Sequence, residues 1–492
     1  MSGHLAINLE SVFGLAVVIL LLWRSEAGRE PSRPRLTLDA RDALPMVLVA
    51  LMICAAFWSA AQISFLSDDY VLVSGAQGFS GNYRAMFTQG GGDGFFRPLG
   101  YLSLAWTWPW AGLDPNRWHW AALLLHLGNS LLVYVLAGAI GLSRSCSWLA
   151  SALFAWHGAN PEAVVWIAGR FDLLAAFFGL LALVAFIKLW EESSPGWGIL
   201  AMASMAAGIL SKESAYAVPL AMLVYAGVRP SSWSRRIRTL APFFLLAAVL
   251  FAYRWVLQGG IGGYLGPGGR PQMLSLSLAA IGKALALRLW AVLFFPVNWA
   301  TGGGAWLEIA TVVYAATWAA LLWAMRWAIR GSRERLLIPL GFVLAAALPP
   351  VQQLLIGADL EKARLVYLPA AGFSLLVASV VSGAGLRPAQ RWGAGFVILA
   401  FNLVALLHNL TGWETAAAKS RIVCEAVAAC SNPASVQGLP RSLNGVYFFA
   451  NGLPECVRME RAQEVRRGQP DLPLHACSLA WDPATGALRP TQ

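Results

Sequence analysis

The chain has 492 residues, of which 58% are hydrophobic and only 12% are charged. Soluble globular proteins carry about 25% charged residues, so this composition excludes a soluble globular protein, as well as a disordered chain, a small disulfide-rich protein and a coiled coil. The formal net charge of +11 would suggest nucleic-acid binding in a soluble protein. In a membrane protein, arginine and lysine in cytoplasmic loops explain it. We therefore predict a polytopic membrane protein that binds no nucleic acid.

Apolar segments long enough to cross a bilayer recur along the chain, since a spanning helix needs about 20 mostly apolar residues. The first, 5–23, is expected to be a retained helix, because no basic residue precedes it and no small-residue cleavage site follows it. The arginine-rich segment after it is expected in the cytoplasm, which places the N-terminus outside. Further crossings are predicted at 45–63, 119–141, 148–166, 171–190, 197–211, 214–228, 239–257, 305–325, 336–354, 366–382 and 392–410.

The segment 275–298 is apolar but contains Lys283 and Arg288. The basic residues after helix 305–325 lie in the cytoplasm only if this segment does not cross, so we predict an interfacial or re-entrant segment on the outer side. The predicted fold is thus all-α, a bundle of about twelve transmembrane helices with a long outer loop at 64–118. Its predicted parts are an N-terminal helix and cytoplasmic loop (1–44), a transmembrane module (45–410) and a small extracytoplasmic tail (411–492).

The tail is charged and interrupted by proline and glycine, and it is predicted to hold a helix at 413–430 and a strand at 445–449. We place it in an oxidising compartment, which favours disulfides among its four cysteines. Sequence alone does not choose among the three possible pairings. A zinc site is the alternative, although no CxxC spacing supports it. The disulfide candidates are Cys424, Cys430, Cys456 and Cys477, whereas Cys54 and Cys146 are expected to be inert.

An acidic pair, Asp68-Asp69, opens the first outer loop directly after a predicted helix. Adjacent carboxylates repel one another, which raises the pKa of one of them. That suits a general base, or a group that binds a cation or a hydroxyl. The alternative is a solvated helix end.

Basic residues also gather near the predicted outer ends of helices. Guanidinium and ammonium groups are the expected partners of phosphate. If they line one outward-facing cavity with the acidic pair, the combination indicates group transfer from a membrane-borne phosphorylated donor. The phosphate would leave while a carboxylate deprotonates an acceptor hydroxyl. The basic residues are Arg97, Arg170, Lys212 and Arg364.

Several of these polar residues also have simpler explanations. His126 and Asn129 are three residues apart and share a helix face, but a packed, hydrogen-bonded histidine is the alternative for His126. Arg170 and Asp172 could pair with each other alone.

The polar residues, in this order, resemble the GT-C class of integral-membrane glycosyltransferases, and more narrowly the bacterial relatives of the TMTC and protein O-mannosyltransferase (PMT) families. The resemblance covers about 60–410. It departs from the family at Gly158, where the family has proline, and the tetratricopeptide repeats of TMTC proteins are absent. The similar pieces are Asp68-Asp69, Phe96 to Leu99, Leu123 to His126 with Asn129 to Leu131, His157 to Asp172, Leu210 to Glu213 and Arg364 to Pro369.

The resemblance implies transfer of one sugar from a polyprenyl-phosphate carrier to an acceptor outside the cytoplasmic membrane, a protein hydroxyl or an envelope glycan or lipid. It implies Asp68 or Asp69 as the catalytic base, with the family pattern favouring Asp68. Arg97, Arg170, Lys212 and Arg364 become donor-phosphate ligands. The residues implied to support the site are His126, Asn129, His157, Glu162, Asp172, Glu213 and Tyr367.

We therefore expect an inverting, metal-independent glycosyltransferase without a cofactor, in a bacterial inner membrane, with its active site and tail facing the periplasm. A divalent metal and a diphosphate-linked donor, as in the oligosaccharyltransferase branch of GT-C, are the alternative chemistry. A transporter or lipid-handling protein is the alternative class, although transporters carry charges near the bilayer midplane and often inverted repeats. A third alternative is a non-catalytic membrane scaffold that displays the tail.

Overall fold

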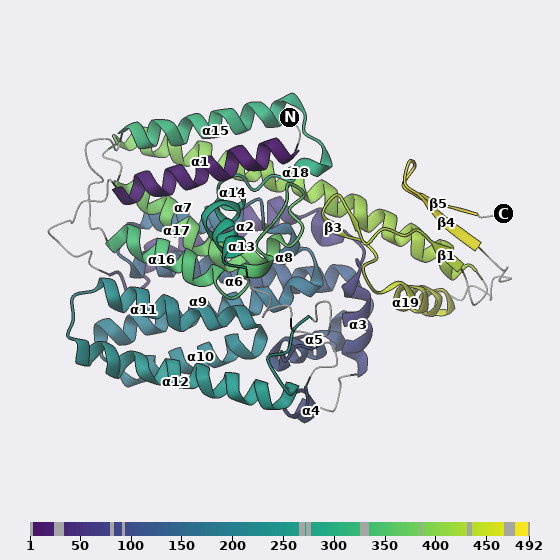
Figure 1. Ribbon diagram of the computed structural model, residues 1–492, viewed down its shortest axis with the longest axis horizontal. Coiled ribbons are helices and arrows are strands. Elements are labelled where there is room, and N and C mark those ends of the chain that lie inside the picture. Colours follow the sequence, from purple (N-terminus) through teal and green to yellow (C-terminus); the bar gives the residue numbers. More distant parts are fainter. Residues whose placement is uncertain are drawn as a thin grey trace.

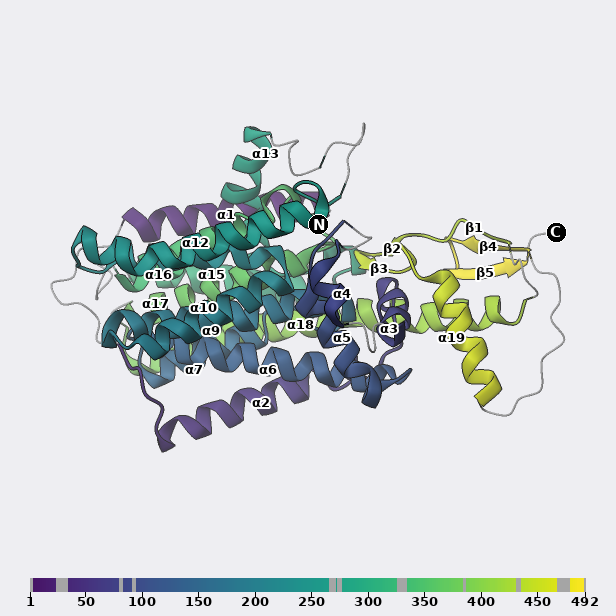
Figure 2. The same ribbon diagram turned by 90° about the horizontal axis from the view of Figure 1, so that it is seen from below.

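The computed structural model describes residues 3–23, 34–78, 83–90, 94–264, 271, 277–324, 334–383, 386–430, 435–466 and 478–490. Most of these residues form helices that run side by side in one bundle (Figure 1). The C-terminal strands and a short helix lie beyond one end of this bundle. Figure 2 shows that a single long helix extends from the bundle into this smaller part.

A helix lies at or close to each of the twelve predicted crossings, in the same order along the chain. Within the described residues, seven helical segments are long and apolar enough to cross a membrane, and the chain is a multi-pass membrane protein. The predicted all-α fold is confirmed. In chain order the helices are α1 (Gly3–Trp23), α2 (Ala43–Phe57), α6 (Pro115–Ala139), α7 (Arg144–Ala155), α9 (Arg170–Glu192), α10 (Pro195–Ser211), α11 (Val218–Val228), α12 (Trp233–Gln258), α15 (Ala305–Ala324), α16 (Glu334–Ala347), α17 (Tyr367–Gly383) and α18 (Pro388–Ala428).

Burial separates a central helix from peripheral ones. In the segment that contains α17, 89% of the apolar window is buried, whereas the value is 22% for both α12 and α15. Figure 1 accordingly places α12 and α15 at opposite edges of the bundle. A helix that is apolar on all sides belongs either in a bundle interior or against lipid. The core therefore lies around α17, and the outer helices expose their apolar faces to lipid.

The predicted helix 148–166 is wrong in its second half, because α7 ends at Ala155 and the chain turns. A short helix, α8 (Pro161–Val164), and a 3-10 turn at Ile167–Gly169 follow. Pro161 takes the first position of α8, where its missing N–H costs no hydrogen bond. Gly158 permits a close approach, since a Cβ there would lie 2.5 Å from the Pro296 carbonyl oxygen.

The predicted re-entrant segment 275–298 forms two short helices, α13 (Leu278–Lys283) and α14 (Leu289–Phe294), joined by a π-helical turn at Ala284–Arg288. It is not among the candidate spans found in the described residues, and α14 packs against α1. Its position relative to the bilayer stays a prediction. In its described residues, the outer loop 64–118 contains three helices before the start of α6: α3 (Asp68–Gly78), α4 (Tyr83–Thr88) and α5 (Pro98–Ala111).

The tail is more structured than predicted. Helix α18 runs unbroken past residue 411, and α19 (Leu453–Arg466) packs against it. The predicted strand at 445–449 shrinks to β3 (Val446–Tyr447), which pairs antiparallel with β2 (Ser442–Leu443). In a second sheet, β4 (Ser478–Asp482) lies between β1 (Ser435–Gln437), to which it is parallel, and β5 (Ala487–Pro490), to which it is antiparallel.

A disulfide between two of the four candidate cysteines joins the two tail helices. Cys424 of α18 and Cys456 of α19 are bonded, with their Cα atoms 5.8 Å apart. Cys54 and Cys146 are free, as expected. Cys477 lies outside the described residues, so its pairing stays a prediction.

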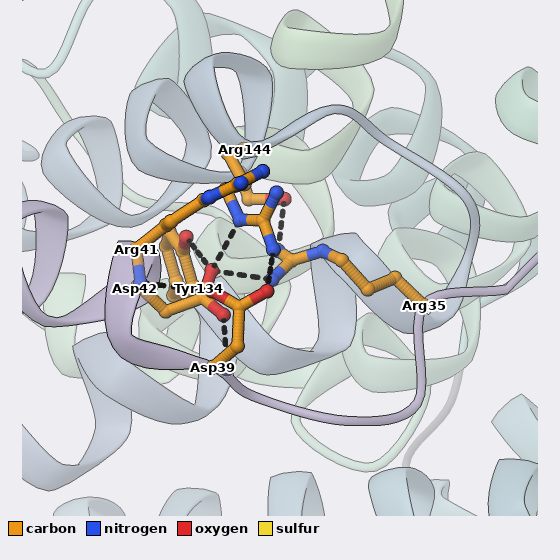
Figure 3. A network of polar contacts seen from close by, with 7 residues as sticks. Arg35, Asp39, Arg41, Asp42, Tyr134 and Arg144 are labelled. Atoms are coloured by element: carbon orange, nitrogen blue, oxygen red, sulfur yellow. Dashed lines mark hydrogen bonds and ion pairs between the residues drawn. The ribbon is translucent and has the colours of Figure 1, made fainter.

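A polar network anchors the other end of the bundle (Figure 3). The Asp42 carboxylate, which is 1% exposed, accepts hydrogen bonds from Arg35 Nη1 at 2.5 Å, the Tyr134 hydroxyl at 2.5 Å and Arg144 Nε at 3.2 Å. These partners come from the segment before α2, from α6 and from α7. A buried charge needs such partners, and this one ties α2 to both helices.

Candidate active site

A cavity of about 520 Å³ lies where the outer-loop helices meet the ends of α10 and α12 and the tail. This volume is typical of small-molecule sites. Five of the predicted site residues line it, from four parts of the chain: Asp68 begins α3, Arg97 directly precedes α5, Lys212 and Glu213 follow α10, and Arg364 lies in the turn before α17. The tail contributes Asn451, Gly452 and Glu455 to the lining.

Asp68 is the first residue of α3 and faces this cavity. Its Oδ1 accepts a hydrogen bond of 2.7 Å from Asn451 Nδ2. The preceding residue, Ser67, has φ +46°, a left-handed conformation that turns the chain abruptly into the helix. A carboxylate at a helix N-terminus is also favoured by the helix dipole. The local backbone therefore presents Asp68 to the cavity.

Asp69 faces away from the cavity and is not among its lining residues. Its side chain is 1% exposed. It accepts backbone N–H bonds from Leu66 and Ala168, both at 3.1 Å. Burial raises the pKa of the Asp69 carboxyl well above its usual range. Its contacts join the start of α3 to the 3-10 turn before α9.

Two arginines share one acid on the cavity wall. Arg97 donates from Nε and Nη2 to Glu213 Oε2, at 3.0 and 2.8 Å. Arg254 Nη2 lies 3.3 Å from the other oxygen of Glu213. The shared carboxylate thus holds both guanidinium groups at the cavity with little conformational freedom.

A second group of charges lies next to the first. Lys212 Nζ donates to Asp172 Oδ2 at 2.5 Å. Arg364 pairs with Glu162, and its Nε lies 4.0 Å from Asp172 Oδ2. The Arg364 guanidinium also lies over the Trp166 ring, 4.6 Å from its centroid. Burial raises the pKa of Glu162 to about 7, although Arg364 opposes the shift.

The charge of the combined cluster suits an anionic ligand. Its cations are Arg97, Lys212, Arg254 and Arg364, and all four line the cavity. They are balanced by Glu162, Asp172 and Glu213, of which only Glu213 is in the lining. Asp68 and Glu455 also line the cavity, so the positive charge is local to the wall formed by the four cations. Guanidinium and ammonium groups gathered in this way are the usual partners of phosphate.

Arg170 lies away from the cavity. Its Nη1 donates to Thr107 Oγ1 at 2.6 Å and its Nη2 to the Trp118 carbonyl at 3.3 Å. The guanidinium also lies 5.0 Å from the Trp118 ring centroid. These contacts connect α9 with α5 and α6. The side chain is 2% exposed.

The remaining predicted residues form buried hydrogen bonds inside the bundle. His126 Nδ1 lies 2.7 Å from the Tyr367 hydroxyl, to which Asn129 Nδ2 donates at 3.1 Å. His157 Nε2 lies 3.1 Å from the Leu293 carbonyl oxygen. None of these four side chains is in the cavity lining. Their arrangement matches the packed, hydrogen-bonded alternative considered for His126.

Among the cavity residues that sequence reasoning missed, Arg254 and Asn451 matter most to the charged groups. Arg254 lies in the apolar helix α12, and an ionisable residue within a span is costly and usually functional, so this signal was available. Asn451 had no such signal, because a single asparagine in a polar tail is unremarkable. Its importance arises only from its contact with Asp68 in the folded chain.

Residues 113–256 match the family model described as dolichyl-phosphate-mannose-protein mannosyltransferase. The chain is 34% identical over 125 residues to the protein O-mannosyl-transferase Tmtc1 of Drosophila melanogaster, covering 25% of this chain and 15% of that protein. It is 32% identical over 152 residues to the protein O-mannosyl-transferase tmtc2 of Xenopus laevis, covering 30% of this chain and 18% of that protein. The chain thus matches less than a fifth of the length of either relative.

A solved structure is also similar in overall shape. The crystal structure of ArnT from Cupriavidus metallidurans bound to undecaprenyl phosphate has a TM-score of 0.48 and 15% sequence identity, covering 91% of this chain and 94% of that chain. The matched family region, 113–256, contains Glu162, Asp172, Lys212, Glu213 and Arg254 of the charged cluster. The resemblance to the PMT and TMTC families that the sequence motifs predicted is therefore confirmed for this region of the chain.

Proposed function

We propose that this chain is a glycosyltransferase that moves a sugar from a polyprenyl phosphate to an acceptor hydroxyl outside the cytoplasm. The observation that carries the proposal is that Asp68 and four cations line the same cavity. Transfer from a phosphorylated donor needs a base at one side of the reacting carbon and positive charge at the other. The family match over 113–256 and the mannosyltransferase relatives support this reaction class.

In the proposed reaction, the acceptor oxygen attacks C1 of the sugar while the bond between C1 and the phosphate oxygen breaks. The polyprenyl phosphate leaves with the bonding electrons, and the Asp68 carboxylate takes the proton of the acceptor hydroxyl. Attack on the face opposite the leaving group inverts the configuration at C1. The cations stabilise the negative charge that develops on the leaving phosphate.

The acids behind the cations hold them in place before the donor arrives. Glu213 binds Arg97 and Arg254, and Asp172 binds Lys212. Fixed donors cost no reorganisation during the reaction. In this proposal Arg170 and Asp69 support the surrounding helices and loop, since neither lines the cavity and both bond to neighbouring elements.

We also propose that the cavity and tail face the periplasm of a bacterial inner membrane. The Cys424–Cys456 disulfide supports this orientation, because disulfides persist in oxidising compartments. The arginine-rich network around Asp42 lies near the opposite end of α6 from Trp118, in agreement with the excess of basic residues expected on the cytoplasmic side.

The test is a transfer assay with the purified protein in liposomes and radiolabelled polyprenyl-phosphate mannose as probe, in the presence of envelope extract. Release of polyprenyl phosphate and labelling of the envelope fraction are measured together. We expect Asp68→Asn to lower kcat by about 10²-fold or more, the usual loss for a general base. Glu192→Gln, at an exposed carboxylate, is the matched control. Wild-type kcat for Asp68→Asn would overturn the mechanism.

Metal independence is part of the proposal. Among the residues that the structure describes, no group of three or more histidine, cysteine, aspartate or glutamate side chains could hold a metal ion. We expect activity to survive dialysis against a chelator. Loss of activity that Mg²⁺ or Mn²⁺ restores would favour the metal-dependent alternative instead.

A transporter or lipid-handling protein remains the second candidate. Helix α10 ends at Ser211 and the chain continues in a 3-10 turn at Glu213–Ala217, an interruption that resembles the broken helices of transporters. The same assay separates the two functions. Binding of the lipid-linked sugar without release of polyprenyl phosphate would favour the second.

A further inference from the structure

We propose that the C-terminal tail completes the active site, with Asn451 as a positioning residue for Asp68 and the Cys424–Cys456 disulfide holding Asn451 in place. This inference rests on the proposed function, because it assumes that Asp68 is the base. It assigns a role to the tail, which lies beyond the matched family region at 113–256.

The tail touches the chain directly around Asp68. Asn451 Nδ2 donates to Asp68 Oδ1 at 2.7 Å, and the backbone N–H of Asn451 lies 3.4 Å from Ser67 Oγ. At the next residue, Gly452, a Cβ would lie 2.3 Å from the Ser67 carbonyl oxygen. The Phe449 ring stacks on Tyr70 with centroids 6.4 Å apart. The tail therefore contacts Ser67, Asp68 and Tyr70 around the proposed base, and only glycine at 452 permits the closest approach.

One amide sets the orientation of the carboxylate. Asp68 has two oxygens, and the Asn451 bond occupies Oδ1 from the tail side. Rotation of the carboxylate would break this bond, so Asn451 selects one orientation. A base must meet the acceptor hydroxyl within hydrogen-bond distance and direction. Asn451 itself lines the cavity but, in this proposal, takes no proton.

The disulfide fixes the tail segment that carries Asn451. Cys456 lies in the first turns of α19, just after Asn451, and its partner Cys424 lies near the end of α18. Both cysteines are buried, with exposed fractions of 1% and 3%. Cys424 Sγ lies 3.4 Å from the Tyr70 hydroxyl, so the cross-link sits against α3 itself. Without it, the start of α19 would be held against α3 by non-covalent contacts alone.

The test of the positioning role uses two substitutions of Asn451 in the transfer assay described above. Asn451→Ala removes the donor, and Asn451→Asp keeps the shape but replaces the donor with a second carboxylate beside Asp68. We expect both to lower kcat by about 10- to 100-fold, the effect of a small misplacement of a reacting group. The KM for the polyprenyl-phosphate probe should stay within about twofold, because the donor cations lie on other elements.

The two variants separate positioning from simple packing. A space-filling role would leave the isosteric Asn451→Asp at wild-type kcat, and that result would overturn the proposal. Gln437→Ala, at an exposed amide of the tail strand β1, is the matched control and should keep wild-type kcat. Thermal unfolding and gel filtration of each purified variant show that the fold is retained.

The role of the disulfide is tested by Cys456→Ala alone and together with Asn451→Ala. We expect Cys456→Ala to lower kcat, as Asn451→Ala does. The double variant should be no slower than Asn451→Ala alone, since both substitutions act through the contact between Asn451 and Asp68. Additive losses, or wild-type kcat in Cys456→Ala, would overturn this part. If Cys456→Ala does not fold, Gly452→Ala displaces the tail from Ser67 without touching the cysteines and should lower kcat likewise.

Failure of this inference is distinguishable from failure of the proposed function. If Asp68→Asn keeps wild-type kcat, the proposed mechanism fails regardless of Asn451. If Asp68→Asn is inactive while Asn451→Ala and Asn451→Asp are fully active, only the role of the tail is overturned.

Discussion

Asp68 and Asp69 are neighbours in the chain, yet their carboxylates lie in different environments. Asp68 faces the cavity and accepts a hydrogen bond from Asn451, whereas Asp69 is buried and accepts backbone N–H bonds. They begin a helix, in which successive residues are rotated by about 100°. Two adjacent side chains at its first turn therefore cannot share one environment, and in our proposal they have separate roles.

The first prediction concerns Asp69. We expect Asp69→Asn to lower the free energy of unfolding by about 1–3 kcal/mol, because the new amide N–H₂ would face backbone N–H groups in place of an acceptor. Asp68→Asn should lower it by less than about 1 kcal/mol, the size of the lost helix-dipole interaction at a partly exposed position. Thermal unfolding in detergent measures both. A larger loss of stability in Asp68→Asn would contradict the assignment.

The second prediction concerns Arg254, which lies in an apolar helix and shares Glu213 with Arg97. We expect Arg254→Met to lower kcat/KM for the polyprenyl-phosphate probe by about 10²-fold, the loss typical of a removed charge-stabilising donor. Arg254→Lys should retain part of the activity, since it keeps the charge but not the planar geometry.

Arg238→Met is the matched control, because Arg238 lies on the same helix, is exposed and is not in the cavity lining. Equal values of kcat/KM for Arg254→Met and Arg238→Met would show that Arg254 has no special role.

The third prediction concerns pH and Glu162. Burial raises the pKa of Glu162 from its ordinary value of 4.5 to about 7 in the folded protein. Between these values the folded state holds a proton that the unfolded state lacks, so the free energy of unfolding falls as pH rises. This contribution is fully present below pH 4.5 and is lost as pH rises through about 7.

Glu162→Gln removes the titrating group and should flatten that part of the profile. The measurement is the unfolding midpoint of the wild type and the variant across this pH window. Parallel profiles would show that Glu162 does not titrate there.

The fourth prediction concerns Asp42 in the network of Figure 3. We expect Asp42→Ala to lower the free energy of unfolding by about 1.5–3 kcal/mol, the range for lost hydrogen bonds to a charged group, since Arg35 and Arg144 are left partly exposed to solvent. The activity per folded molecule should be unchanged, because the network lies away from the cavity. Arg41→Ala, at an exposed neighbour, is the control. A loss of kcat in folded Asp42→Ala protein would show coupling between the two ends.

Local sequence properties were sufficient to predict the fold class and the positions of most helices. Hydrophobic runs correctly predicted helices such as α6, α9 and α12. A segment in lipid has to form its backbone hydrogen bonds within itself, and a helix does so. The prediction was wrong at 148–166, where α7 ends at Ala155 and a turn with Gly158 leads to a new short helix that begins at Pro161, although the sequence stays apolar.

The candidate site, too, was predictable only in part. Scarcity of charge identified Arg97, Lys212, Glu213 and Arg364, since ionisable residues near spans are rarely accidental. Tertiary structure alone decided which of them face one cavity, which acid of Asp68-Asp69 is accessible, and that Asn451 reaches Asp68. Composition and hydrophobic runs are properties of neighbouring residues and can be read along the chain. A hydrogen bond between residues 68 and 451 exists only after the helices have packed and the tail has folded back onto α3.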